Sequence, residues 1–268
     1  MVTCRSTALP GGAITRPETK MSEQVGRTET ALITGAAQRI GRSLALALAE
    51  RGINVVVHYR QSAEQAEQVC AAVAERGVRA WPLSADLGDP EAATALVERA
   101  LGLSGSLDVL INNASSFSPD SIADASFDTL VANLRVNAWA PLLLSRSFAR
   151  LVGRGRIVNL LDSKLMSHDR DHVSYLLSKH MLSVMTRMTA LEFAPGITVN
   201  AVAPGLILPP AGRDERYLEA LARGVPLQRH GTTADVAAAV LFLLQSDFIT
   251  GQVIYVDGGS HLGEQGEP

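Results

Sequence analysis

The fold is decided by the stretch Ala31-Leu-Ile-Thr-Gly-Ala-Ala-Gln-Arg-Ile-Gly41 near the start of the chain. Its first four residues form a short apolar run, which is typical of a buried strand. The part Thr34–Gly41 (TGAAQRIG) combines two glycines with small residues, as a tight turn beside a pyrophosphate requires. A helix expected over residues 40–50 would present free N–H groups and its positive dipole end to those phosphates. The stretch therefore predicts a strand, turn and helix that bind a dinucleotide.

The alternation of strand and helix continues to the end of the sequence. Further strands are expected over residues 54–59, 80–83, 109–112, 156–161, 198–201 and 252–256. Helices are expected over 62–77, with Ser62 and Gln65 as a capping box, from Asp89-Pro90 onward, within 128–151, and over 172–194 and 234–244. This order predicts a single-domain α/β fold of the doubly wound Rossmann type, with a mostly parallel seven-stranded sheet and helices on both faces.

The two ends of the chain differ from this body. Residues 1–28 hold scattered Pro, Gly and charged residues without an apolar block, which excludes a secretory signal and favours a disordered extension, or a true start at Met21. Three arginines there fit an organellar transit peptide, but Glu18 and Glu23 argue against one. We expect a reductase domain over 29–262 and a short tail over 263–268.

Composition excludes several classes of protein. The net charge is −3, and no basic stripe suited to nucleic acid is present. The longest apolar run, Val236–Leu244, is too short to span a bilayer. Cys4 and Cys70 are the only cysteines, so neither a disulfide framework nor a cysteine-based metal site is expected. We expect a cytoplasmic enzyme that binds a small molecule, without a metal, a nucleic acid or a membrane as partner.

Candidate site residues fall where the predicted strands end. They are Gly35, Asp86, Asn112, Asp162 and Pro204. Ligands of open parallel sheets bind beyond the carboxyl ends of the strands. We therefore expect these residues to meet at one edge of the sheet.

The end of the second strand predicts which dinucleotide binds. NAD-binding proteins usually place Asp or Glu there, but this sequence has His58-Tyr-Arg-Gln-Ser62, without a carboxylate. Arg60 would attract a 2′-phosphate, and Ser62 would donate a hydrogen bond to it. Arg39, within the Gly-rich turn, adds positive charge. These residues favour NADPH over NADH; the alternative for Arg60 is a solvated surface charge.

Tyr175 and Lys179 form the candidate catalytic pair. Their i, i+4 spacing places both on one face of the helix expected over 172–194. An ammonium group near a tyrosine favours the phenolate, as an acid catalyst requires. The pair predicts that Tyr175 transfers a proton while the dinucleotide transfers a hydride.

Together these features resemble the short-chain dehydrogenase/reductase family over about residues 29–260. The shared motifs are Thr34–Gly41, Asp86-Leu87, Asn112-Asn-Ala114, Asn137, Tyr175 with Lys179, Pro204-Gly205 and Asp257-Gly-Gly259. The resemblance implies that Tyr175 donates a proton, Lys179 binds the nicotinamide ribose and Asn137 supports a proton-relay water. It places the cofactor against Gly35, Arg39, Ile40, Gly41, His58, Tyr59, Arg60, Ser62, Asp86, Leu87, Asn112, Ala114, Ser115, Tyr175, Lys179, Pro204, Gly205 and Leu206.

One departure from the family pattern points to a substrate. Most members have a serine thirteen residues before the tyrosine, whereas this chain has Asp162. The adjacent Ser163 would point to the other face, because side chains alternate at a strand end. A carboxylate suits a ring that carries N–H groups, and in this respect the chain is similar to pteridine reductases and bacterial dihydromonapterin reductases. That resemblance implies a pterin held by Arg39, Ser115, Phe117, Asp162, Tyr175, Leu208 and Pro209, with the Phe117 ring stacked on it.

The sequence thus predicts NADPH-dependent reduction of a dihydropteridine to its tetrahydro form, with dihydrofolate and oxidised pterin as further candidate substrates. Two alternatives stay open: a carbonyl reductase for a 3-oxoacyl thioester or a sugar ketone, and a non-catalytic NADPH-binding regulator. Phe117 has an alternative role in a small apolar cluster, and Asp162 has one as a cap at the end of its strand.

Residues 206–230 are expected to form a substrate flap with a short helix over 214–222. The family resemblance also implies a homotetramer formed through the helices within 128–151 and 172–194.

Overall fold

The computed structural model describes residues 28–166, 170–210 and 212–263. Cys4, Met21 and almost all of the predicted extension and tail lie outside these ranges. Seven strands form one sheet in the order β3-β2-β1-β4-β5-β6-β7, and each of its six pairings is parallel. The strands are β1 (Thr30–Ile33), β2 (Asn54–Tyr59), β3 (Ala80–Ser84), β4 (Val109–Asn112), β5 (Gly155–Leu160), β6 (Ile197–Pro204) and β7 (Val253–Val256).

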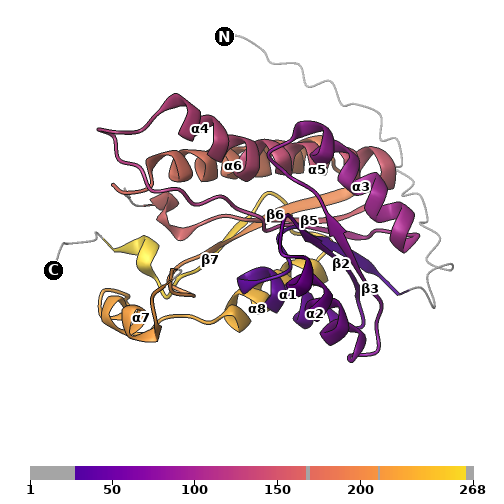
Figure 1. Ribbon diagram of the computed structural model, residues 1–268, viewed down its shortest axis with the longest axis horizontal. Coiled ribbons are helices and arrows are strands. Elements are labelled where there is room, and N and C mark those ends of the chain that lie inside the picture. The colour runs from indigo at the N-terminus through magenta and orange to yellow at the C-terminus, as the bar shows by residue number, and fades with distance from the viewer. Residues whose placement is uncertain (1–27, 167–169, 211, 264–268) are drawn as a thin grey trace, which may run out of the picture.

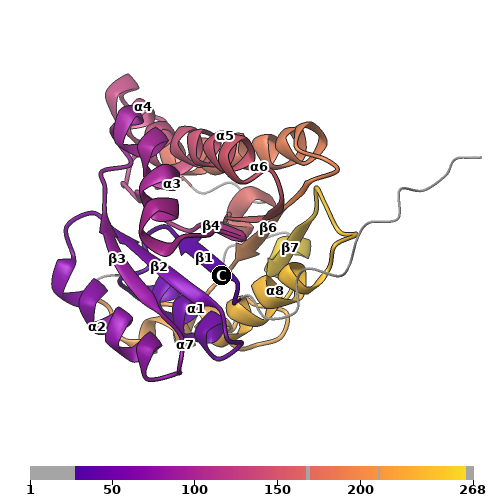
Figure 2. The same ribbon diagram turned by 90° about the vertical axis from the view of Figure 1, so that its right-hand side faces the viewer.

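Helices cover both faces of the sheet, as Figures 1 and 2 show. They are α1 (Arg39–Ala49), α2 (Ala63–Ala74), α3 (Pro90–Ser104), α4 (Phe127–Leu134), α5 (Ala140–Val152), α6 (Val173–Glu192), α7 (Glu215–Ala222) and α8 (Thr233–Gln245). Helices α1, α2 and α8 pack on one face through a core of Ala, Val and Leu side chains, and α3, α5 and α6 pack on the other. The predicted doubly wound α/β fold is confirmed.

The register brings the strand ends to one edge. Ile33 of β1 pairs with Ile111 of β4, Asn112 pairs with Asn159 of β5, and Leu160 pairs with Val202 of β6. All these strands run in the same direction, so the segments that follow them lie side by side. The candidate residues named above therefore share one edge, as predicted.

The sheet, predicted to be mostly parallel, is parallel throughout. The region 128–151 holds helical segments as predicted, and a π-helical turn over Arg135–Trp139 separates them. Two local predictions need correction. The strand expected over 198–201 spans Ile197–Pro204. Ser62 forms no capping bond at the start of α2, because its hydroxyl accepts a hydrogen bond from the Gln38 side chain instead (3.3 Å). Asp89 does cap α3, accepting from the Glu91 N–H with Pro90 following it, as predicted.

Candidate active site

The turn after β1 needs glycine at two positions. Gly35 has φ +63°, and a Cβ there would lie 3.0 Å from the Ala114 Cα. A Cβ on Gly41 would lie 2.2 Å from the Gly35 carbonyl oxygen, closer than side chains can approach. The Asn113 amide donates to the carbonyls of Thr34 (2.9 Å) and Gly35 (3.1 Å) and thereby holds the turn. Glycine at these two positions lets the turn pack closely at the start of α1, where free N–H groups suit a phosphate group.

His58 supports this turn through its side chain. The Gly35 N–H donates to its Nδ1 (3.0 Å), and its Nε2 lies 3.2 Å from the Ala85 carbonyl oxygen. Burial lowers the pKa of His58 to about 4, so the ring is neutral at physiological pH. A neutral ring accepts at Nδ1 and donates at Nε2, which matches both contacts. Since both nitrogens are used, the His58 side chain acts on the predicted cofactor site by positioning Gly35.

The segment that follows β2 is open to solvent and carries no carboxylate. Arg60 is exposed, while Tyr59 and Ser62 are half-buried. Arg39, with φ +54°, begins α1, and its guanidinium donates to the Pro209 carbonyl oxygen (3.0 Å). Arg39 therefore joins the Gly-rich turn to the segment after β6.

Tyr175, Asp162 and Lys179 meet beyond the end of β5. The Tyr175 hydroxyl donates to Asp162 Oδ2 at 2.7 Å, and the Lys164 N–H holds Asp162 Oδ1 at 2.9 Å. Lys179 Nζ donates to the Leu160 carbonyl oxygen (2.8 Å) and lies 5.7 Å from the centre of the Tyr175 ring. Ser163 is buried and faces Gly205, because a Cβ on that glycine would lie 3.2 Å from its Oγ. The carboxylate, not the serine, contacts the tyrosine.

Burial changes the charge of the Lys179 side chain. Only 3% of the residue is exposed, and loss of water lowers its pKa from 10.5 to about 8. The Asp162 carboxylate acts in the opposite direction by favouring the ammonium form. The pKa of Lys179 therefore lies near physiological pH, and the Asp162 carboxylate helps to keep the ammonium form.

Asn137 lies in the π-helical turn and holds the segment after β4. Its Nδ2 donates to the Ser116 carbonyl oxygen (2.8 Å) and to Ser178 Oγ (2.9 Å). Its Oδ1 accepts from the Ser116 N–H (2.7 Å) and from Ser115 Oγ (3.2 Å). Single π-helical turns widen a helix locally and are frequent at functional sites. Here the turn lets Asn137 bond both to α6 and to the predicted substrate segment.

Phe117 stands at the open side of the site. Its side chain is 52% exposed, and its ring meets the Tyr175 ring edge-on with centroids 4.7 Å apart. Its ring contacts with Tyr175 and His172 fit the alternative of a residue in a small cluster, but half of Phe117 still faces solvent. The exposed part of the ring is available to a flat ligand beside the tyrosine hydroxyl.

Other predicted cofactor residues lie at the ends of β3 and β4. Asn112 is buried and donates to Asn159 Oδ1 (2.8 Å), which ties β4 to β5, and Leu87 is buried as well. Asp86 is exposed after β3, where its carboxylate accepts from the Gly88 N–H. Their contacts with a cofactor stay predictions.

The end of β6 and the segment that follows it carry three further residues of the predicted cofactor site. Pro204 ends β6, and a Cβ on Gly205 would lie 2.5 Å from the Asp257 Cβ, so only glycine fits there. The Leu206 carbonyl oxygen accepts from the Gly231 N–H (2.9 Å), and the half-buried Leu208 packs against the core on the α1 side. The predicted short helix is present as α7, which lies in the chain between Leu206 and Gly231.

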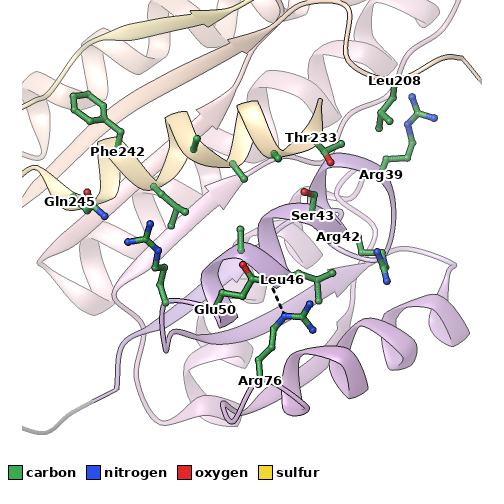
Figure 3. A pocket seen from close by; sticks show the side chains of 16 residues that line it. Arg39, Arg42, Ser43, Leu46, Glu50, Arg76, Leu208, Thr233, Phe242 and Gln245 are labelled. Carbon is green, nitrogen blue, oxygen red and sulfur yellow. Dashed lines mark hydrogen bonds and ion pairs between the residues drawn. The ribbon is translucent and has the colours of Figure 1, made fainter. Parts of the chain in front are cut away.

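A separate groove of about 740 Å³ runs between α1 and α8. Figure 3 shows Arg39 and Leu208 at one end of it and Phe242 and Gln245 at the other. Neither Tyr175 nor Asp162 lines it, so this groove is separate from the place where the candidate catalytic residues meet. Within residues 28–166, 170–210 and 212–263, no cluster of three or more His, Cys, Asp or Glu side chains suits a metal ion. No helix in those ranges is long and apolar enough to cross a membrane.

Two residues that position the site were not given roles from the sequence. Asn113 lies within the motif Asn112-Asn-Ala114 and Ser178 lies next to Lys179, and each is bonded to a residue of another predicted motif. Asn113 had one usable signal, because a tight turn of small residues needs a neighbouring donor for its carbonyl groups. Ser178 had none, since its partner Asn137 is 41 residues away in the chain.

Known proteins are similar to this chain over most of its length. A family model described as enoyl-(acyl carrier protein) reductase matches residues 35–261. The 3-oxoacyl-[acyl-carrier-protein] reductase FabG of Staphylococcus aureus is 32% identical, covering 88% of this chain and 99% of its own. A short-chain type dehydrogenase/reductase of Picea abies is 33% identical, covering 85% and 91%. This chain belongs to the short-chain dehydrogenase/reductase family.

A solved structure adds a second kind of relative within this family. The alternative dihydrofolate reductase FolM of Brucella canis, crystallised with NADP, superposes with a TM-score of 0.82 at 31% identity. The match covers 88% of this chain and 95% of the FolM chain. The protein is thus an oxidoreductase with relatives named for two different reactions, reduction of a 3-oxoacyl group on acyl carrier protein and reduction of dihydrofolate.

Proposed function

We propose that this reductase uses NADPH to reduce a dihydropteridine to the tetrahydro form. The observation that carries the proposal is the 2.7 Å hydrogen bond from the Tyr175 hydroxyl to Asp162, where most of the family has serine. A half-exposed phenyl ring, Phe117, stands beside that hydroxyl and offers a stacking surface for a flat heterocycle. The similarity to the dihydrofolate reductase FolM, whose structure contains NADP, supports both the cofactor and the substrate class.

The reaction saturates a C=N bond of the ring. NADPH supplies a hydride for the carbon when it is bound. The Tyr175 hydroxyl gives its proton to the adjacent nitrogen, and the Lys179 ammonium stabilises the phenolate that remains. Asp162 holds the Tyr175 hydroxyl in place and accepts hydrogen bonds from the N–H groups of the pterin. A carboxylate accepts such bonds more strongly than a serine hydroxyl does. By the family resemblance, Asn137 supports the water molecule that returns a proton to Tyr175.

The cofactor choice is a first expected result. Arg60 and the absence of a carboxylate over residues 58–62 favour a 2′-phosphate, so kcat/KM should be higher with NADPH than with NADH. Arg60→Ala should lower kcat/KM for NADPH about tenfold and leave that for NADH within about twofold, because a charge-assisted bond contributes on the order of 1.5 kcal/mol. Arg76→Ala, which removes an exposed arginine paired with Glu50, is the matched control. A preference for NADH in the parent enzyme would contradict the proposal.

The pH dependence of NADPH binding is a second expected result. Below pH 8 Lys179 is an ammonium group that binds the ribose, and above its pKa of about 8 it is neutral. Affinity for NADPH should therefore fall as pH rises through about 8. Asp162→Asn removes the negative charge that raises this pKa, so it should move the fall to lower pH. Fluorescence titrations between pH 6 and 10 measure both; a shift to higher pH would contradict the account.

The alternative substrate is a carbonyl compound. FabG of Staphylococcus aureus and the versicolorin reductase of Emericella nidulans, which is 35% identical over 251 residues, favour it. The site geometry favours the pterin instead, because Asp162 stands where a carbonyl reductase needs a neutral donor for the substrate oxygen. The other alternative, a regulator that binds NADPH without catalysis, has no need for the ordered contacts of Tyr175, Lys179 and Asn137.

We also propose that the enzyme is a cytoplasmic homotetramer. Helix α6 buries Leu176 and Leu182 in its own subunit, whereas Val184, Met188 and Leu191 are 55%, 63% and 83% exposed. An exposed apolar row of this kind on a long helix is typical of a face that packs on another copy. Light scattering of the purified protein should give the mass of about four chains.

A further inference from the structure

Asp120 joins two segments that lie far apart in the chain. It belongs to residues 113–126, which connect β4 to α4 and carry Phe117. Its N–H donates to the Asp171 carbonyl oxygen (2.9 Å), and its own carbonyl oxygen accepts from the Val173 N–H (3.1 Å). The carboxylate is buried: Oδ1 accepts from the Ser174 N–H (3.0 Å), and Oδ2 accepts from the Ser174 hydroxyl.

These bonds cap α6 from another segment. The residue in the N-cap position, His172, makes no capping bond with its own side chain. The Asp120 carboxylate satisfies a free N–H group in its place and puts negative charge at the positive end of the helix dipole. The next residue after Ser174 is Tyr175, so the cap acts immediately beside the proton donor.

The same junction places an aromatic ring behind Phe117. His172 pairs with Asp120 in an isolated parallel β-bridge of the backbone. The His172 ring stacks on the Phe117 ring, with centroids 4.0 Å apart and an angle of 19° between the planes. Phe117 in turn meets Tyr175 edge-on. Three rings are thus packed in a row, from the start of α6 to the proposed substrate surface and back to the proton donor.

We propose that Asp120 is a positioning residue that latches the Phe117 segment to the start of α6. The latch fixes the distance between the surface that stacks on the substrate and the hydroxyl that protonates it. Displacement of such groups by about 1 Å can cost on the order of 10²-fold in rate. This inference rests on the proposed function in that it treats Phe117 as a substrate contact.

The variant Asp120→Ala tests the latch. It should lower kcat/KM for the dihydropterin about 30-fold or more, through both a higher KM and a lower kcat, since Phe117 and Tyr175 lose their common support. The Kd for NADPH should stay within about twofold, because the hydrogen bonds that hold the Gly35 turn and Lys179 involve residues other than Asp120. Asp120→Asn retains an acceptor for the Ser174 N–H and is itself a good capping residue, so it should recover most of the activity.

Two further variants complete the series. Asp124→Ala is the matched control, because Asp124 lies in the same segment but is exposed and accepts from the N–H and hydroxyl of its neighbour Ser121. It should leave kcat and KM unchanged. Ser174→Ala removes one of the two bonds to the Asp120 carboxylate and should give an intermediate loss. That variant also keeps the test valid if Asp120→Ala does not fold.

The outcomes separate a latch from a simple helix cap. A cap alone would lower the melting temperature of Asp120→Ala while kcat and KM at 25 °C stayed at parent values, and that result would overturn the proposal. Equal loss of NADPH and substrate binding would overturn it too. If the parent enzyme reduces no dihydropterin, the proposed function fails by itself. The same variants are then compared with whichever substrate is reduced, so the latch is judged separately.

Discussion

Tyr175→Phe should lower kcat by about 10²-fold to 10⁴-fold, the usual contribution of a positioned general acid. The substitution removes only the hydroxyl that donates to Asp162 and keeps the ring against Phe117. The proton for the substrate nitrogen must then come from water. Steady-state rates of NADPH oxidation with a dihydropterin, measured under saturating conditions, give the decrease.

Binding of the cofactor is the control for this variant. Lys179 keeps its bond to the Leu160 carbonyl oxygen, and the Gly-rich turn is untouched, so the Kd for NADPH should change less than about threefold. The melting temperature should stay close to that of the parent, because one partly buried hydrogen bond contributes about 1 kcal/mol. A Tyr175→Phe enzyme with more than a tenth of the parent kcat would show that another group delivers the proton.

Asp162→Asn is expected to have the second largest effect, a loss of about 10²-fold in kcat/KM for a dihydropterin. The amide still accepts from the Lys164 N–H, so the strand end should keep its shape. It no longer carries the negative charge that accepts strongly from the pterin N–H groups and from Tyr175. The exposed Asp247, changed to Asn, is a control for the loss of one carboxylate elsewhere.

The competing role of Asp162 is a cap at the end of β5. If Asp162→Asn turned over dihydrobiopterin or dihydromonapterin at the parent rate, that role would suffice and catalysis would not need the carboxylate. A gain of ketone reduction in Asp162→Ser would not decide between the two, because a serine there restores the common family pattern whatever the parent reduces.

The sequence predicted the fold and the meeting of the main site residues because both depend on local patterns. Alternating periodicities predict a parallel sheet, and parallel strands bring their carboxyl ends to one edge. The rule places Asp162 at this edge and helical spacing pairs Tyr175 with Lys179, while their roles come from the family resemblance. The structure adds the 2.7 Å distance that makes Asp162 and Tyr175 a pair.

The sequence could not predict contacts that depend on the exact path of loops. The π-helical turn around Asn137 has no local pattern, and the contacts of Asn137 with Ser116 and Ser178 join residues 21 and 41 positions apart. The two uses of the His58 ring and the capping of α6 by Asp120 join residues 23 to 54 positions apart. Ser62 failed as a cap because Gln38, in another turn, competes for its hydroxyl.

The substrate specificity of the parent enzyme is the most direct test of the central claim, that Asp162 and Tyr175 serve a ring imine. NADPH oxidation should be measured side by side with dihydrobiopterin, dihydromonapterin, dihydrofolate and a 3-oxoacyl thioester. The account predicts that at least one dihydropterin is reduced to its tetrahydro form, with kcat/KM at least about tenfold above that of the thioester. Efficient reduction of the thioester with no turnover of any pterin would contradict it.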